Sequence, residues 1–293
     1  MHKSFVPVAL AATLFLVAVP AVEAAPGFSM QAAAFVDDAD GTSIDVAAQF
    51  RPTESLTLSL GGGQSDTSAD ATDFSGSSIH GGIDLHRGRF GAALHASQWD
   101  DSDQFTSRIV SGELSWTFAE SLEVALLLED RALEVDYTVT GPLGRAVAQN
   151  ARFSGNGLGA RVSWIGEQWS AYAGGTSYDY DDRLDRLVTA SRLPTTSRFP
   201  RVAALVNSVL TRTAGAIDYQ ASVGLERAFA RAGIGADLTL SSDALSGADS
   251  TSYSANFRYD LTTHWGVDAT LGMTDTDGFD SVGFAGLGFS YRN

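Results

Sequence analysis

The feature that most constrains this chain is a two-residue alternation of apolar and polar side chains. It is strongest over residues 251–273. Tyr253, Phe257 and Tyr259 there share one face with small apolar residues, and serine, asparagine and arginine occupy the other. Trp265 begins a second alternating run after a short polar turn. Successive side chains of a β-strand point to opposite faces, so this segment is predicted to be a hairpin with one apolar and one polar face.

The same alternation recurs along most of the 293 residues, without a change in composition that would indicate a second domain. The connections between these runs are alternately short polar turns and longer polar segments. The segmentation gives about fourteen strands, with twelve or sixteen as alternatives. We therefore expect an all-β fold built from antiparallel hairpins.

The first 24 residues have the order of segments that is typical of a secretory signal peptide. Lys3 is followed by an apolar run over residues 5–19 and, after Pro20, by a small-residue stretch over residues 21–25. We expect cleavage after Ala24, which makes residues 1–24 the signal peptide and residues 25–293 the mature domain. An uncleaved anchor helix at the N-terminus is the alternative. The mature chain is expected to be exported.

Composition excludes several classes of site. No later run reaches the roughly 18 apolar residues that a membrane-spanning helix needs, so a membrane-inserted chain would cross with strands. The chain has no cysteine, which rules out disulfides and thiolate metal sites. The formal net charge of -16 argues against nucleic-acid binding, because contact with phosphates needs clustered positive charge.

The aromatic residues favour a transmembrane, antiparallel, up-and-down β-barrel. They gather near the short turns and the C-terminus, as an interfacial belt would require. Closure would pair every edge strand, which hydrocarbon demands of a membrane sheet. A soluble β-sandwich or β-solenoid of an exported protein is the alternative. The predicted belt comprises Phe50, Phe90, Trp116, Phe118, Trp164, Trp169, Tyr259, Trp265 and Tyr291.

Three stretches depart from the regular pattern. Residues 65–77 are rich in serine, aspartate and threonine and are predicted to be a long loop. Over residues 129–156 the alternation changes phase, which predicts a hairpin that extends beyond the membrane with a bulge near Asp130; two extra wall strands are the alternative. Residues 178–215 are too long for an ordinary connection and could include a short helix over residues 200–210.

Several short motifs are better explained as parts of strands and turns. Residues 155–160 have the letters of a dinucleotide-binding fingerprint, but an alternating strand follows them where a helix is needed. Residues 38–41 and 275–280 are rich in aspartate without the full ligand set of a calcium loop, so we expect plain turns there. No local signature accompanies any serine, and His80 and His95 fall on the polar face, so no catalysis is expected.

The polar face carries the remaining candidates for function. Rings of carboxylates favour cations in a water-filled pore, whereas inward charges that only pair with arginines would leave no preference. The predicted pore-lining residues are Asp45, Asp84, Glu113, Glu123, Arg161, Asp218, Glu226, Asp237, Arg258 and Asp268.

The last strand resembles the C-terminal assembly strand of bacterial outer-membrane barrels. Ala285, Leu287, Phe289 and Tyr291 alternate with small residues, although Asn293 and not an aromatic ends the chain. The pattern over residues 26–293 is similar to that of bacterial porins, both the smaller monomeric and the trimeric ones. This resemblance implies passive diffusion of small hydrophilic solutes across the outer membrane, without cofactor, in contact with lipid and lipopolysaccharide and after insertion by the barrel-assembly machinery.

Two alternatives remain open for how such a barrel works. Residues 181–212 are rich in arginine and could fold inward as a constriction or remain an outer loop. The barrel could also be non-conducting, with a structural, adhesive or lipid-active role. The constriction candidates are Arg183, Arg186, Arg192, Arg198 and Arg201.

Overall fold

The computed structural model describes residues 27–38, 41–69, 72–101, 105–118, 121–140, 146–181, 217–244, 247–278 and 280–293. The predicted signal peptide and the five constriction candidates lie outside these ranges, as does the proposed helix over residues 200–210. The strands are β1 (Gly27–Asp37), β2 (Thr42–Thr53), β3 (Leu56–Ala69), β4 (Thr72–Arg87), β5 (Phe90–Asp101), β6 (Phe105–Phe118), β7 (Leu122–Thr140), β8 (Ala146–Ile165), β9 (Trp169–Tyr180), β10 (Ile217–Ala228), β11 (Ala232–Asp243), β12 (Asp249–Asp260), β13 (Trp265–Thr276) and β14 (Val282–Arg292).

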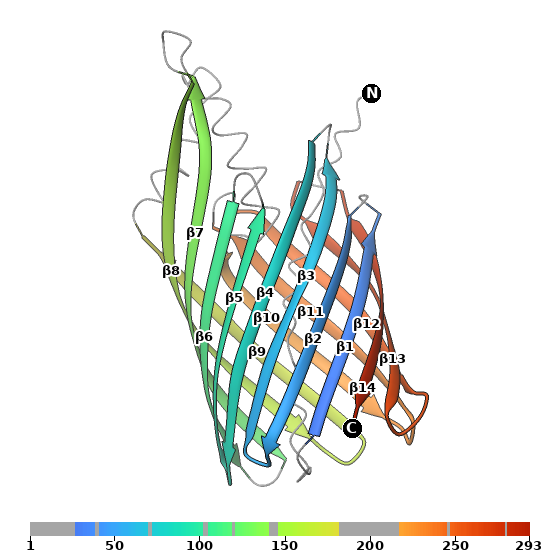
Figure 1. Cartoon of the computed structure of the whole chain (residues 1–293). Helices are drawn as coiled ribbons and strands as arrows, with labels where there is room; N and C mark the ends of the chain where they lie inside the picture. Colours follow the sequence, from blue (N-terminus) through green and yellow to red (C-terminus); the bar gives the residue numbers. More distant parts are fainter. Residues whose placement is uncertain are drawn as a thin grey trace.

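These fourteen strands form one closed antiparallel barrel in which each strand pairs with its neighbours in sequence (Figure 1). The first and last strands close it, with Ala32 opposite Phe289 and Ala34 opposite Leu287. Because β1 and β14 pair with each other, neither is left with an open edge. The predicted all-β barrel and its strand number are confirmed.

The part of the chain that the structure describes contains no helix long and apolar enough to cross a membrane.

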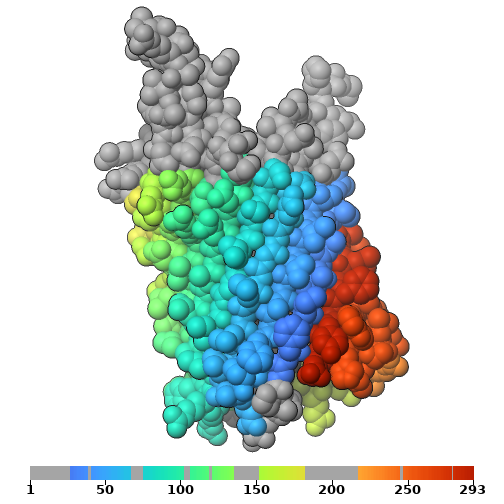
Figure 2. Space-filling view, in the orientation of Figure 1, coloured from blue at the N-terminus to red at the C-terminus, as the bar shows by residue number. Residues whose placement is uncertain are grey.

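Side chains alternate between the two faces of the wall as the sequence predicts. The apolar set is exposed on the convex face, where Leu60, Leu271 and Leu287 each leave more than half of their surface accessible. Residues of the other parity face inward and are more buried, as Ala125 and Arg131 illustrate. Figure 2 shows the wall as a continuous outer surface over β1 to β6. An exposed apolar surface of this extent needs an apolar environment.

Aromatic side chains mark one end of the barrel, at the short turns that follow the even-numbered strands from β2 to β12. Phe90 stacks on Trp116 with ring centroids 5.4 Å apart, and Trp265 lies 4.9 Å from Tyr291. The chain terminus belongs to the same end, because the Asn293 backbone amide donates to the carbonyl of Phe28 (2.9 Å). We call this the short-turn end.

The hairpin of β7 and β8 extends beyond the neighbouring strands, as the sequence predicts (Figure 1). The predicted bulge near Asp130 is wrong, because the ladder between β7 and β8 runs without a register shift. The apolar residues change face instead. Leu128 is exposed outward, whereas Leu133 and Phe153 lie inward and are almost fully buried. Outward positions at this height carry Asp130 and Glu134, as contact with water requires.

The predicted loop over residues 65–77 is also wrong. Strands β3 and β4 pair from Leu56 opposite Leu85 up to Ala69 opposite Thr72, so most of this polar stretch is extended hairpin. A ladder is held by backbone hydrogen bonds, which do not depend on apolar side chains, so it continues where the apolar alternation of the sequence stops.

Candidate functional site: the inner face of the barrel

The inner face brings together most of the predicted pore-lining residues. Asp45, Asp84, Glu113, Glu123, Arg161, Glu226, Asp237, Arg258 and Asp268 all occupy inward positions of the register. Asp218 departs from the pattern. The ladder between β10 and β11 shifts between Ile217 and Tyr219, so Asp218 has no partner residue in the register there and is exposed.

A charged network crosses the inner face from β6 to β8. Arg161 places its Nη2 atom 2.7 Å from Glu113 Oε1 and 3.7 Å from Glu123 Oε1. Its side chain is only 13% exposed. Arg161 lies opposite Ala125 of the intervening strand, which is buried to 2% exposure, so a small residue occupies the position over which the guanidinium passes. One arginine therefore contacts two carboxylates on two strands.

Two histidines extend this acidic side of the barrel toward β2. His95 Nε2 lies 3.1 Å from Asp84 Oδ1, and His80 Nδ1 lies 4.0 Å from Asp45 Oδ2. Inward glycines make room for these rings: a Cβ at Gly82 would overlap the imidazole of His95. Each histidine is thus held beside an aspartate on a neighbouring or next-but-one strand.

A second, hydrogen-bonded network crosses the inner face from β9 to β13. The Tyr172 hydroxyl donates to Asp237 Oδ1 (2.7 Å), and the side-chain amide of Asn256 donates to Asp237 Oδ2. The Thr270 hydroxyl then donates to Asn256 Oδ1 (2.9 Å). The two networks occupy different parts of the inner face. The first, with the His95–Asp84 pair, involves β4 to β8, and the second joins residues of β9, β11, β12 and β13.

The space for this second network depends on Gly224 of β10. Tyr172 and Asp237 flank it on the neighbouring strands, and a Cβ at Gly224 would overlap both side chains. Any other residue at this position would force the tyrosine away from the carboxylate.

A third cluster lies inward near the end opposite the short turns. The Arg131 guanidinium contacts Glu129 and donates to the Tyr178 hydroxyl (3.1 Å), and its charge lies 4.4 Å from the centroid of the Tyr178 ring. Tyr180 stacks on Tyr178, and its hydroxyl donates to the carbonyl of Ile217 (3.1 Å). Burial raises the pKa of Tyr180 to about 12. The cluster joins β7, β9 and β10 above the exposed apolar part of the wall.

Sequence reasoning missed the partners that organise these charges. Tyr172, Asn256 and Thr270 all fall on the polar face by simple alternation, so that signal could have identified them as inward residues. The contacts of Arg131 could not be predicted from alternation. They depend on the change of face along β7, where the apolar pattern alone suggests a bulge.

The short motifs behave as strands and turns where the structure describes them. Residues 155–160 lie in the middle of β8, so no helix follows the glycines. The Gly41 amide donates to Asp37 Oδ1 (2.7 Å) in the turn after β1. Over the described ranges, no group of three or more histidine and carboxylate side chains is placed to hold a metal ion.

Comparisons with known proteins show the same architecture. No protein-family model matches the sequence, and no curated protein matches it. Among solved structures, the monoaromatic hydrocarbon channel CymD is similar with a TM-score of 0.50 and 11% identity, over 92% of this chain and 87% of that one. The KdgM porin gives a TM-score of 0.44 with 9% identity over 90% of this chain and 98% of that one. OccAB1 of Acinetobacter baumannii gives 0.47 with 7% identity over 92% and 96%.

The similarity to CymD, at 11% identity, concerns the fold alone. It agrees with the closed antiparallel barrel, its exposed apolar exterior and its charged interior. The chain therefore has the fold of the outer-membrane channel barrels.

Proposed function

We propose that this chain is an outer-membrane porin through which small hydrophilic solutes diffuse passively. The observation that supports this most is the division of the wall into two faces. Apolar side chains are exposed outward and end in an aromatic belt, while charged residues such as Glu113 and Asp237 face inward. A barrel of about fourteen strands is wide enough to hold water unless a segment fills it.

The proposed pore prefers cations. Seven of the predicted inner-face carboxylates occupy inward positions, against the two arginines Arg161 and Arg258. Arg161 is shared between two carboxylates and Arg258 lies 3.9 Å from Asp268, so neither offsets the rest of the set. Inward carboxylates lower the energy of a cation in the pore and raise that of an anion.

The test is conductance and reversal potential of the purified protein in a planar bilayer under a salt gradient. We expect discrete channels whose reversal potential has the sign of cation preference. Glu226→Gln should reduce that preference, whereas Asp130→Asn, which removes a charge from an outward position, should not. An absence of channels would overturn the porin proposal and favour a non-conducting barrel, and an anion-preferring reversal potential would overturn the charge argument.

The arginine-rich connection after β9 is proposed to constrict this pore. Arg183, Arg186, Arg192, Arg198 and Arg201 would then face the acidic wall and select solutes by charge and orientation. Deletion of residues 183–211 should raise single-channel conductance markedly. Unchanged conductance would assign the segment to the outer surface.

The proposal also includes processing and placement. Cleavage after Ala24 would release the mature chain, which the barrel-assembly machinery would insert with the short-turn end toward the periplasm. The opposite end would then meet lipopolysaccharide. The intact mass of the membrane-extracted protein should match residues 25–293, and the native barrel should migrate differently on electrophoresis before and after heating. Cross-linking in the membrane decides between monomer and trimer.

A further inference from the structure

Two arginines lie on the outer surface at the short-turn end, among aromatic side chains. Arg227, near the end of β10, has its guanidinium carbon 5.1 Å from the centroid of the Trp169 ring and 5.0 Å from that of Phe229. Both rings are exposed, as is Arg227 itself. Cation–π contacts hold the charge in place without neutralising it.

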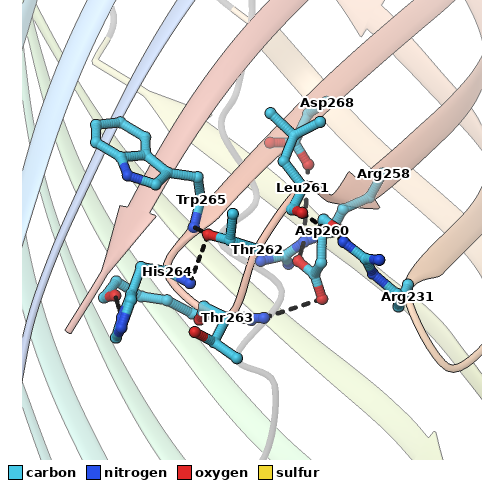
Figure 3. Close-up of polar contacts among 10 residues, drawn as sticks. Arg231, Arg258, Asp260, Leu261, Thr262, Thr263, His264, Trp265 and Asp268 are labelled. Atoms are coloured by element: carbon cyan, nitrogen blue, oxygen red, sulfur yellow. Dashed lines mark hydrogen bonds and ion pairs between the residues drawn. The ribbon is translucent and has the colours of Figure 1, made fainter.

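Arg231, in the turn between β10 and β11, is held differently. Its Nε and Nη2 atoms donate to the backbone carbonyl of Asp260 (3.1 and 2.8 Å), and Nη2 also donates to the carbonyl of Leu261. The guanidinium carbon lies 5.4 Å from the centroid of the Tyr259 ring. Figure 3 shows Arg231 reaching the neighbouring turn from the side opposite His264. Carbonyl oxygens orient this side chain but leave its full positive charge.

The nearby carboxylates are directed elsewhere. Asp260 Oδ2 lies 2.9 Å from Arg292 Nη2, and Asp260 Oδ1 lies 4.0 Å from Arg258 Nε. Glu226 occupies an inward position, on the other face of the wall from Arg227. Within the described residues, no ion pair joins Arg227 or Arg231 to a carboxylate. This rim therefore exposes two positive charges on a protein whose overall charge is strongly negative.

We propose that Arg227 and Arg231 bind the phosphate of an anionic phospholipid at the periplasmic side of the membrane. A guanidinium presents paired donors that match phosphate oxygens, and the aromatic belt places these donors at headgroup height. Exposed Leu225, Ile234 and Phe257 continue from the arginines along the outer wall, where acyl chains would lie. The inference depends on the membrane placement in the proposed function but not on solute conduction.

Lipid retention measured by native mass spectrometry of the detergent-purified full-length mature barrel tests the proposal. Phosphatidylglycerol is titrated against wild type, the double variant Arg227→Gln/Arg231→Gln and the control Arg87→Gln/Arg89→Gln, which alters two arginines of another short turn. We expect the affinity of the double variant to fall by about thirtyfold, since each of the two basic residues near an anionic surface contributes about 1 kcal/mol. The control should bind as wild type does.

A second comparison uses the unaltered protein and keeps the test decisive if the double variant fails to fold. Diacylglycerol has the same chains as phosphatidylglycerol but lacks the phosphate that both arginines would contact, and it should bind about thirtyfold more weakly. Equal binding of the two lipids, or equal binding by wild type and a folded double variant, would overturn the proposal. Competition by millimolar inorganic phosphate would assign the site to a free anion instead. Channel recordings on the same preparation separate these outcomes from a failure of the porin proposal.

Discussion

Arg161 on β8 reaches across β7 to place its guanidinium 2.7 Å from the carboxylate of Glu113 on β6. The same guanidinium lies 3.7 Å from the carboxylate of Glu123, so one positive charge interacts with two negative charges. All three side chains are mostly buried against the inner wall. This contact ties three consecutive strands together on the face that we propose to line the pore.

Replacing Arg161 by glutamine should make the pore more cation-selective, because Glu113 and Glu123 lose the charge that partly offsets theirs. The reversal potential in a salt gradient measures this change. The barrel should also lose on the order of 2 kcal/mol of stability, since a buried charged partner is left unsatisfied. Arg161→Lys retains the charge and is the control. An unchanged reversal potential in the glutamine variant would contradict a pore-lining role for this cluster.

Replacing Tyr172 by phenylalanine tests the second network. The change removes only the hydroxyl that donates to Asp237 (2.7 Å), and a hydrogen bond to a charged group contributes about 1.5–3 kcal/mol. Urea titration of the folded band on electrophoresis should show a lower midpoint. Tyr253→Phe, which removes a hydroxyl from the outward face, should leave the midpoint unchanged. Equal midpoints for wild type and Tyr172→Phe would mean that this hydrogen bond does not stabilise the wall.

Gly224 offers a steric test of the same network. Valine at this position would overlap the ring of Tyr172 and the carboxylate of Asp237, so one of them must leave the inner wall. We expect lower stability and a changed single-channel conductance. Gly235→Ala is the matched control, since a Cβ there makes only ordinary contacts with Glu226 and Asn256. If the valine variant has the stability and single-channel conductance of wild type, Tyr172 and Asp237 move aside without destabilising the barrel.

The alternation of side chains was enough to predict the strands and the faces on which most charged residues lie. The reason is physical: a slip of one residue would move every apolar side chain to the wrong face, so the pattern fixes the register. Asp45, Arg161 and Asp268 therefore lie inward as predicted. Asp218 has no partner residue in the ladder between β10 and β11, because the register shifts beside it, and such a shift leaves no mark in the residue types.

The pattern fails where the apolar face of a strand stops or changes side. Residues 65–77 lack an apolar face, so their sequence resembles a loop although the ladder continues through them. Along β7 the apolar face changes from Leu128 outward to Leu133 inward within an unbroken strand. Contacts between non-adjacent strands, such as that of Tyr172 with Asp237, could not be predicted. Alternation gives the face on which a residue lies but not which residues of other strands lie beside it on that face.

The last prediction concerns Tyr180, the final residue of β9, which pairs with Gly155 above the exposed apolar part of β8. Burial raises its pKa to about 12, whereas an unfolded tyrosine ionises near 10. The contribution of Tyr180 to stability is therefore complete below about pH 10 and is lost as pH rises toward 12, because the unfolded state releases this proton first. In an absorbance titration at alkaline pH, wild type and Tyr180→Phe should form the same amount of tyrosinate near pH 10, and wild type should form one tyrosinate more near pH 12. If the difference in absorbance between wild type and Tyr180→Phe shows a transition centred at pH 10, Tyr180 ionises as an exposed tyrosine does, and the cluster with Arg131 and Tyr178 is open to water.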